Sequence, residues 1–363
     1  MLHERRARAR LLAAILPLTL LAACGNDDPT GMLAEGGGGS LEGDIKASGS
    51  SAQEAAMTAW IAGYQGEQPG VLVQYDAIGS GGGRENLIAG ATDIGGTDAF
   101  LDEEEREAVK ERCGPRGALH VPVYISPIAL PYNLPGVDDL QLTPGTLARI
   151  LDQKITTWDD PAIAQDNPQA DLPDTRITVV HRSDDSGTTE NFLEYLAAAA
   201  PQEWPHEVDK AWPVPAEAAP QNTGVIQVVN ATEGAIGYAD ASVVTGDAVA
   251  IGVGEEFVTF SPKAAARVVD ASDPVDTGLE GDLALELARD TTASGAYPIV
   301  LVSYLVACTH YERPQRAELV RDFLSYIVSE EGQRAAADAA GSSPISDSLR
   351  ERALALVDTI QGG

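Results

Sequence analysis

Short apolar runs alternate along this chain with stretches in which apolar residues recur at helical spacing. The runs 71–75, 121–130, 177–180 and 299–308 resemble strands, and residues 55–64 carry a helical pattern. Alternation of this kind is typical of α/β layers. With 363 residues, the chain is long enough to form two such domains.

Acidic residues greatly outnumber basic ones. The sequence holds 55 Asp and Glu against 24 Lys and Arg, which gives a formal net charge of −31. A surface with this balance repels nucleic acid and anionic lipid. We therefore exclude DNA and RNA as partners.

The N-terminus has the pattern of an export signal. Four arginines lie within residues 5–10, and the mostly apolar run 11–23 is too short to span a bilayer. The run ends Leu21-Ala22-Ala23-Cys24, which resembles the bacterial lipobox, in which the cysteine is lipidated and becomes the new N-terminus. We expect a lipoprotein signal peptide at 1–23, lipidation of Cys24, and a glycine-rich flexible tether at 24–43. The alternative is an ordinary signal peptide with a chance cysteine.

Two cysteines remain after Cys24, at positions 113 and 308. In an exported protein an even remainder suggests a disulfide between Cys113 and Cys308. Two unpaired buried thiols would give the same count, and spacing alone does not separate the two possibilities.

Three places share an order of strand end or turn, then small hydroxyl and glycine residues, then a helix. They are Gly49-Ser50-Ser51, Gly79-Ser80-Gly81 before a helix expected near Arg84, and Ser186-Gly187-Thr188 before a helix expected from Thr189. Helix N-termini carry free amide donors and partial positive charge, so each place is a potential anion site. Simple helix capping by Ser or Thr explains each place equally well when it is taken alone.

Several separated stretches resemble, in order, the periplasmic phosphate-binding proteins of ABC importers. They are 76–83 (DAIGSGGG), 93–99 (DIGGTDA), 157–168 (TWDDPAIAQDNP), 182–188 (RSDDSGT) and 234–238 (GAIGY). The resemblance runs from about residue 45 to 350. It implies the type II periplasmic-binding-protein fold, in which two α/β domains are joined by hinge strands and the ligand lies in the cleft. The chain would cross twice between the lobes, with lobe I at 44–131 and 298–363 and lobe II at 132–297.

The resemblance also implies a function. We expect an extracytoplasmic, lipid-anchored receptor that binds inorganic phosphate and delivers it to the membrane permease of an ABC importer. It implies a monomer attached to the membrane through Cys24, with no catalytic residue, no cofactor and no metal.

Carried over motif by motif, the resemblance assigns the phosphate ligands. They would be Ser51, Ala52, Ser80, Asp98, Arg182, Ser186, Gly187 and Thr188. Asp184 would accept hydrogen bonds from Arg182 and orient its guanidinium, whose planar fork can pair with two anion oxygens. Ala52 departs from the family, which often has a bulky aromatic residue there, so it would contribute only its backbone amide.

Asp98 is unexpected in an anion site, because a carboxylate repels the ligand unless the ligand brings a proton to donate. Phosphate at neutral pH has such a proton and sulfate does not. A buried acceptor without a donor costs a few kcal/mol, so Asp98 would discriminate between the two anions. The alternative is an ordinary turn aspartate in Thr-Asp-Ala.

Two other functions are compatible with parts of this pattern. A binding protein for sulfate, molybdate or arsenate would share the donor set, and arsenate carries the same proton as phosphate. A secreted phosphatase or serine hydrolase is disfavoured, because the sequence has no Gly-x-Ser-x-Gly elbow and its histidines lack metal-ligand spacing.

Overall fold

The structure is a computed structural model that describes residues 41–363. The predicted signal peptide, Cys24 and nearly all of the predicted tether lie outside this range. Across 41–363, no helix is both long enough and apolar enough to cross a membrane.

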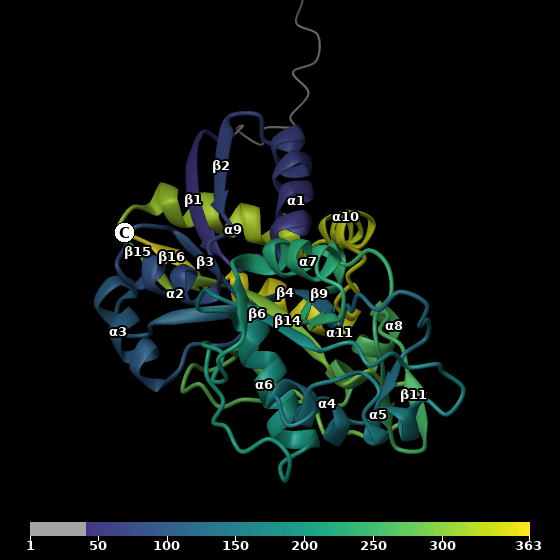
Figure 1. Cartoon of the computed structure of the whole chain (residues 1–363). Coiled ribbons are helices and arrows are strands. Elements are labelled where there is room, and N and C mark those ends of the chain that lie inside the picture. The colour runs from purple at the N-terminus through teal and green to yellow at the C-terminus, as the bar shows by residue number, and fades with distance from the viewer. Residues whose placement is uncertain (1–40) are drawn as a thin grey trace, which may run out of the picture. The chain divides into compact units, whose positions relative to one another are not determined.

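A six-stranded sheet forms the centre of the first lobe (Figure 1). Its order is β2-β1-β3-β14-β4-β9, in which β1 is parallel to β2 and β3, and β14 is antiparallel to β3 and β4. The strands are β1 (Gly43–Gly49), β2 (Val71–Asp76), β3 (Ile94–Thr97), β4 (Ala118–Ala129), β9 (Ala239–Asp240) and β14 (Val300–Cys308). Every residue of β4 and β14 is buried, as their nearly continuous apolar sequences require.

Several helices pack against this sheet. Helix α2 packs on β1 and β3, α9 packs on β1, and α11 packs on β4, while α1 packs on α10. The helices of this lobe are α1 (Glu54–Glu67), α2 (Ser80–Ile88), α3 (Glu103–Cys113), α9 (Pro314–Val328), α10 (Glu330–Ala340) and α11 (Asp347–Val357). The short strands β15 (His310–Tyr311) and β16 (Gln361–Gly362) pair beside α9.

Two three-stranded sheets form the second lobe. One has the order β7-β6-β8, with both pairs parallel, and the other has the order β11-β10-β5. Their strands are β5 (Gln141–Leu142), β6 (Thr178–Arg182), β7 (Glu217–Ala219), β8 (Ala235–Gly237), β10 (Ala250–Val253) and β11 (Glu256–Val258). The helices are α4 (Pro144–Leu151), α5 (Pro161–Asp166), α6 (Gly187–Ala199), α7 (Gln221–Ala231) and α8 (Pro262–Asp270). A 3-10 turn η1 (Ala241–Val243) and the hairpin of β12 (Asp273–Pro274) and β13 (Leu285–Glu286) complete the elements.

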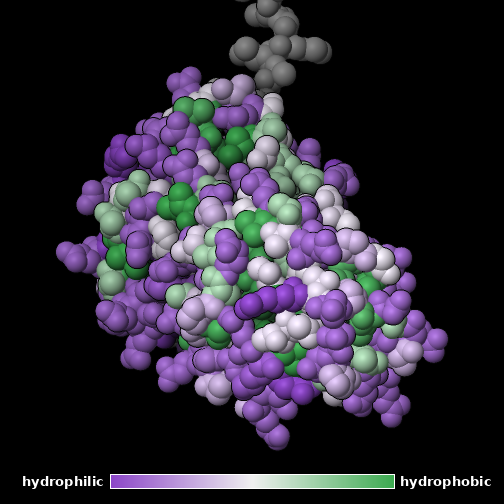
Figure 2. All heavy atoms as spheres, in the orientation of Figure 1, coloured by the Kyte–Doolittle hydropathy of each residue, from purple (hydrophilic) through white to green (hydrophobic). Residues whose placement is uncertain are grey.

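The two lobes meet at the strands in the middle of the molecule. Strand β9 lies between elements of the second lobe in sequence, yet it pairs with the end of β4, where Ile128 faces Asp240. Helix α6 of the second lobe packs on β14. The described residues, 41–363, form one compact unit. Its visible face is mostly hydrophilic, with apolar residues in small scattered groups, as the charged composition requires (Figure 2).

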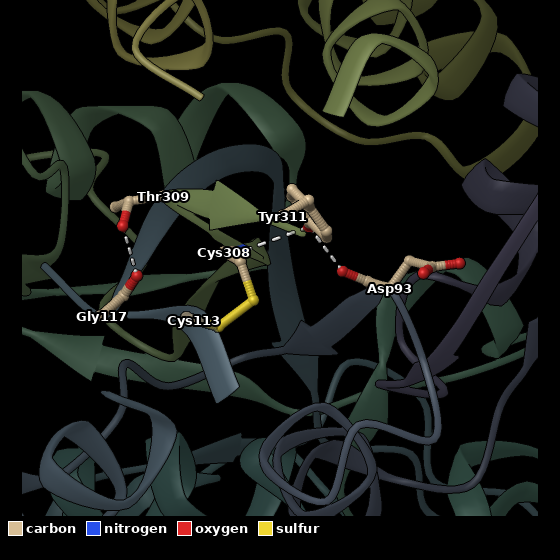
Figure 3. Close-up of a disulfide and its surroundings, with 6 residues drawn as sticks. All are labelled: Asp93, Cys113, Gly117, Cys308, Thr309 and Tyr311. Atoms are coloured by element: carbon tan, nitrogen blue, oxygen red, sulfur yellow. Dashed lines mark hydrogen bonds between the residues drawn. A yellow bond between two sulfur atoms is a disulfide. The ribbon is translucent and has the colours of Figure 1, made fainter. Parts of the chain in front are cut away.

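A disulfide joins Cys113 at the end of α3 to Cys308 at the end of β14 (Figure 3). Hydrogen bonds surround it. Tyr311 accepts from the Cys308 amide at 3.1 Å and donates to the Asp93 carbonyl at 2.7 Å, and the Thr309 hydroxyl donates to the Gly117 carbonyl at 2.8 Å. The disulfide therefore joins the end of helix α3 to the end of strand β14, which are separated by 195 residues in sequence.

The helix starts differ from the sequence expectation. Helix α2 begins at Ser80 rather than near Arg84, and α6 begins at Gly187 rather than Thr189. Ser51 is not adjacent to a helix, because α1 begins only at Glu54. The glycines of α2 stay helical because they allow close packing: a Cβ at Gly83 would lie 2.5 Å from the Gly49 Cα.

Candidate functional site

Three predicted residues lie just beyond the carboxyl ends of neighbouring parallel strands. Ser51 follows β1, Ser80 follows β2 at the first position of α2, and Asp98 follows β3. Carboxyl ends of adjacent parallel strands meet at one edge of a sheet, which is where ligands bind in open α/β folds. All three side chains are buried, with Ser80 only 1% and Asp98 only 3% exposed.

The second lobe contributes the remaining predicted residues in the same way. Arg182 is the last residue of β6, and Ser186, Gly187 and Thr188 form the cap and first turn of α6. The Ser186 hydroxyl accepts a hydrogen bond from the Thr189 amide at 3.1 Å, so it caps the helix. The capping role that the sequence left open is therefore real, and it leaves the Ser186 O–H as a donor.

The two sets of residues are in direct contact. A Cβ placed on Gly187 would lie 2.5 Å from the Ser80 Oγ and 2.7 Å from the Asp98 Cβ, so only glycine fits between them. Close by, the Gly81 amide donates to the Asp185 carbonyl at 3.2 Å across the lobes. The sequence motifs around residues 80, 98 and 187 therefore form one site.

Arg182 is held by two partners. Its Nε donates to the Asp184 Oδ1 at 2.8 Å, its Nη2 donates to the other carboxylate oxygen, and its Nη1 lies 3.4 Å from the Thr188 Oγ1. Burial by itself would raise the pKa of Asp184, but the hydrogen bonds and charge of Arg182 lower that pKa below its usual value. Asp184 is therefore an ionised partner that fixes the plane of the guanidinium.

Asp98 is a buried carboxylate surrounded by hydroxyl groups. Ser80 donates to its Oδ2 at 3.3 Å, Ser303 donates to its Oδ1, and the Asp98 amide donates to the Ser80 Oγ at 3.1 Å. Burial raises the pKa of Asp98, while Ser303, Ser50, the charge of Arg182 and Ser80 each act to lower it. Arg182 and Asp98 therefore influence each other electrostatically from opposite lobes.

Ser51 and Ala52 lie in the segment between β1 and α1. The Ser51 Oγ accepts a hydrogen bond from the Asn222 amide group at 3.1 Å. The backbone amide of Ala52, which we expected to face the anion, donates to the Ser50 Oγ at 3.0 Å. Ser50 in turn stabilises the ionised form of Asp98.

Sequence reasoning missed four residues of this region. Ser303 on β14 binds Asp98, Asn191 on α6 donates to the Asp98 carbonyl at 2.6 Å, and Gln221 and Asn222 begin α7. A serine beside Tyr304 inside an otherwise apolar strand was the only signal for Ser303. The amide side chains carried no signal, because Asn and Gln are ordinary at helix starts and surfaces.

The site offers hydroxyl and guanidinium donors and one carboxylate acceptor. The hydroxyls of Ser51, Ser186 and Thr188 only accept in the bonds described above, so their O–H groups and the Arg182 guanidinium suit an anion with several oxygens. Between residues 41 and 363, no cluster of three or more His, Cys, Asp or Glu residues could hold a metal ion.

A second charged cluster lies beside the site and joins the lobes. The Arg84 guanidinium on α2 contacts the Glu105 carboxylate at 3.0 Å, the Thr97 hydroxyl at 3.0 Å and the Glu190 carboxylate on α6 at 3.4 Å. Burial raises the pKa of Glu190 to about 7; Arg84 opposes the shift, while Glu194 and Glu105 add to it.

This raised pKa predicts a pH-dependent stability. The pKa of Glu190 is higher in the folded state than in the unfolded state. Its contribution to the free energy of unfolding is therefore fully present below the unfolded pKa of 4.5 and is lost as the pH rises through about 7. A Glu190→Gln variant, whose amide oxygen can still accept from Arg84, should melt higher than wild type at about pH 8 and nearly equal to it at about pH 5. Thermal melts at both pH values, with the exposed Glu217→Gln as control, measure this difference. A gap between Glu190→Gln and wild type that is the same at both pH values would contradict the expectation.

Comparison with known proteins agrees with this geometry. Residues 34–331 match the PBP superfamily domain, so the protein is of the binding-protein class. Phosphate-binding protein PstS 3 of Mycobacterium leprae is 34% identical over 352 residues, covering 92% of this chain and 93% of that protein. Its counterpart in Mycobacterium tuberculosis is 35% identical over 356 residues, covering 94% and 95%. This chain belongs to the PstS family of phosphate-binding proteins, which are substrate-binding proteins and not enzymes.

Solved structures show the same fold. The periplasmic phosphate-binding protein PfluDING, bound with phosphate, superposes with a TM-score of 0.69 at 20% identity, covering 86% of this chain and 93% of that one. The prediction of a two-lobed periplasmic-binding-protein fold is confirmed.

Proposed function

We propose that this protein is an extracytoplasmic receptor that binds inorganic phosphate between its lobes and delivers it to the permease of an ABC phosphate importer. Membership of the PstS family supports the class of ligand. The observation that carries the proposal is the buried pair of Arg182 and Asp98, which combines a cation for anion oxygens with an acceptor for a ligand proton.

The phosphate would be bound by Ser51, Ala52, Ser80, Asp98, Arg182, Ser186, Gly187 and Thr188, with Asp184 orienting Arg182. The lobes would be 44–131 with 298–363, and 132–297, moving about the central strands. The buried contacts of Gly187 with Ser80 and Asp98 support these three members of the set, since they bring residues of both lobes together.

We further propose that the receptor acts as a monomer anchored to the cell membrane by a lipid on Cys24, after removal of residues 1–23. The lipobox-like sequence that ends at Cys24 supports the anchor. The excess of acidic residues favours attachment by such a lipid over attraction to anionic headgroups.

Titration calorimetry against phosphate, arsenate, sulfate and molybdate tests the ligand. We expect tight binding of phosphate that is unaffected by excess sulfate or molybdate, with arsenate as a competitor because it carries the same proton. Competition by sulfate in the wild type would instead indicate a general oxyanion receptor. Release of phosphate from an ester would indicate a hydrolase.

A further inference from the structure

The first two residues of helix α7 extend from the second lobe to the first. The Gln221 side-chain amide donates to the Ala77 carbonyl, and the Asn222 side-chain amide donates to the Ser51 Oγ at 3.1 Å. Asn222 is buried, with 1% of its surface exposed, and its partner lies 171 residues earlier in sequence. The rest of α7 packs on β6, β7, β8 and β9. The helix therefore reaches the first lobe at β9 and, through these two side chains, at Ala77 and Ser51.

The same two residues are also bonded to Asp184 beside Arg182 and to strand β9. The Gln221 backbone amide donates to the Asp184 Oδ1 at 3.0 Å, and Asp184 is the carboxylate that orients Arg182. The Asn222 Oδ1 accepts from the Asp240 amide at 3.1 Å, in the strand that pairs with β4. One short segment thus connects Arg182, Ser51 and the central strands.

Gln221 also has an unfavourable backbone conformation. Its φ of +59° lies in the left-handed region, although it is not a glycine. Residues keep such conformations when the surrounding structure fixes them, and they concentrate at functional sites. Here the residue supplies a backbone donor to Asp184 and a side-chain donor to Ala77 together.

We propose that Gln221 and Asn222 form a clamp that closes over the ligand and slows its release. They are positioning residues: Gln221 links Arg182, through Asp184, to the first lobe, and Asn222 holds Ser51 in place. Because the clamp bonds cross between lobes, they form only when the lobes come together. They consequently stabilise the closed state and not the separate lobes. This inference rests on the proposed binding of phosphate.

Stopped-flow measurements of phosphate association and dissociation test the clamp in the full-length protein. Gln221→Asn tolerates the left-handed backbone and keeps the amide donor to Asp184, but its side chain is one methylene too short to reach Ala77. Gln221→Gly removes the side chain and relieves the backbone. Asn222→Ala removes the bond to Ser51. We expect each variant to release phosphate roughly tenfold faster, with little change in the association rate.

Two further measurements separate a clamp from a purely structural role. Without phosphate, the melting temperatures of Gln221→Asn and Gln221→Gly should stay near that of wild type, and Gln221→Gly should release phosphate as fast as Gln221→Asn. Gln227→Asn, an exposed residue on the same helix, is the matched control and should behave as wild type.

The clamp would be overturned if all three variants released phosphate at the wild-type rate. It would also be overturned if the variants lost stability without phosphate to an extent that accounts for the faster release. Either result would leave the proposed function intact. Failure of the wild type to bind phosphate would overturn both.

Discussion

An Asp98→Asn variant is expected to lose its discrimination between phosphate and sulfate. In the wild type, the buried carboxylate would face a sulfate oxygen without a shared proton, which costs a few kcal/mol. The asparagine amide can donate to that oxygen, while its Oδ1 still accepts from the serine hydroxyls around it. Sulfate affinity should therefore rise by roughly two powers of ten or more, while phosphate affinity falls.

Competition calorimetry of phosphate against sulfate measures this change. The matched control is Asp185→Asn, which removes an equal charge from a side chain that is 48% exposed in the loop between β6 and α6. A parallel measurement uses pH: because burial raises the pKa of Asp98, acidification protonates it and sulfate should begin to compete in the wild type. Sulfate exclusion that survives both Asp98→Asn and acidification would remove Asp98 from the selectivity mechanism.

An Arg182→Ala variant is expected to bind phosphate at least about 100-fold more weakly, a loss of about 3 kcal/mol. Truncation removes the two charge-assisted bonds available to the ligand. It also leaves the carboxylate of Asp184 without its partner, which adds to the loss. Arg182→Lys should restore only part of the affinity, because an ammonium group keeps the charge but lacks the planar fork.

The matched control is Arg176→Ala, which removes the same charge from an exposed side chain just before the same strand. Phosphate affinity measured by calorimetry should be unchanged in this control. Equal losses at positions 176 and 182 would mean that only the net charge matters, contrary to a contact role for Arg182.

Much of the site could be predicted from the sequence, because it is built from local motifs. Ser80 and Gly187 open helices that the sequence pattern predicted, whereas β3 was not among the predicted strands and Asp98 was named only through the family resemblance. Parallel strand ends then bring Ser80 and Asp98 together. The exact starts of α2 and α6 could not be predicted, since Gly and Ser have low helix propensity. Tertiary packing against β1 and β3 overrides that propensity in α2.

The long-range partners could not be predicted for a different reason. The bond from Ser303 to Asp98 joins residues 205 positions apart, and that from Asn222 to Ser51 joins residues 171 apart. No local pattern encodes such a pairing, because it depends on how the strands of two lobes are placed in space. The backbone conformation of Gln221 could not be predicted either, since no propensity rule favours glutamine in the left-handed region.

The disulfide between Cys113 and Cys308 encloses the whole second lobe within one covalent ring. A backbone cut anywhere in that ring, as by an extracellular protease, still leaves a single connected molecule. The large sheet then holds the two fragments together, because a cut in the second lobe leaves β3 and β4 on one fragment and β14, which pairs with both, on the other. A protein built in this way withstands cleavage of its surface loops without losing either fragment.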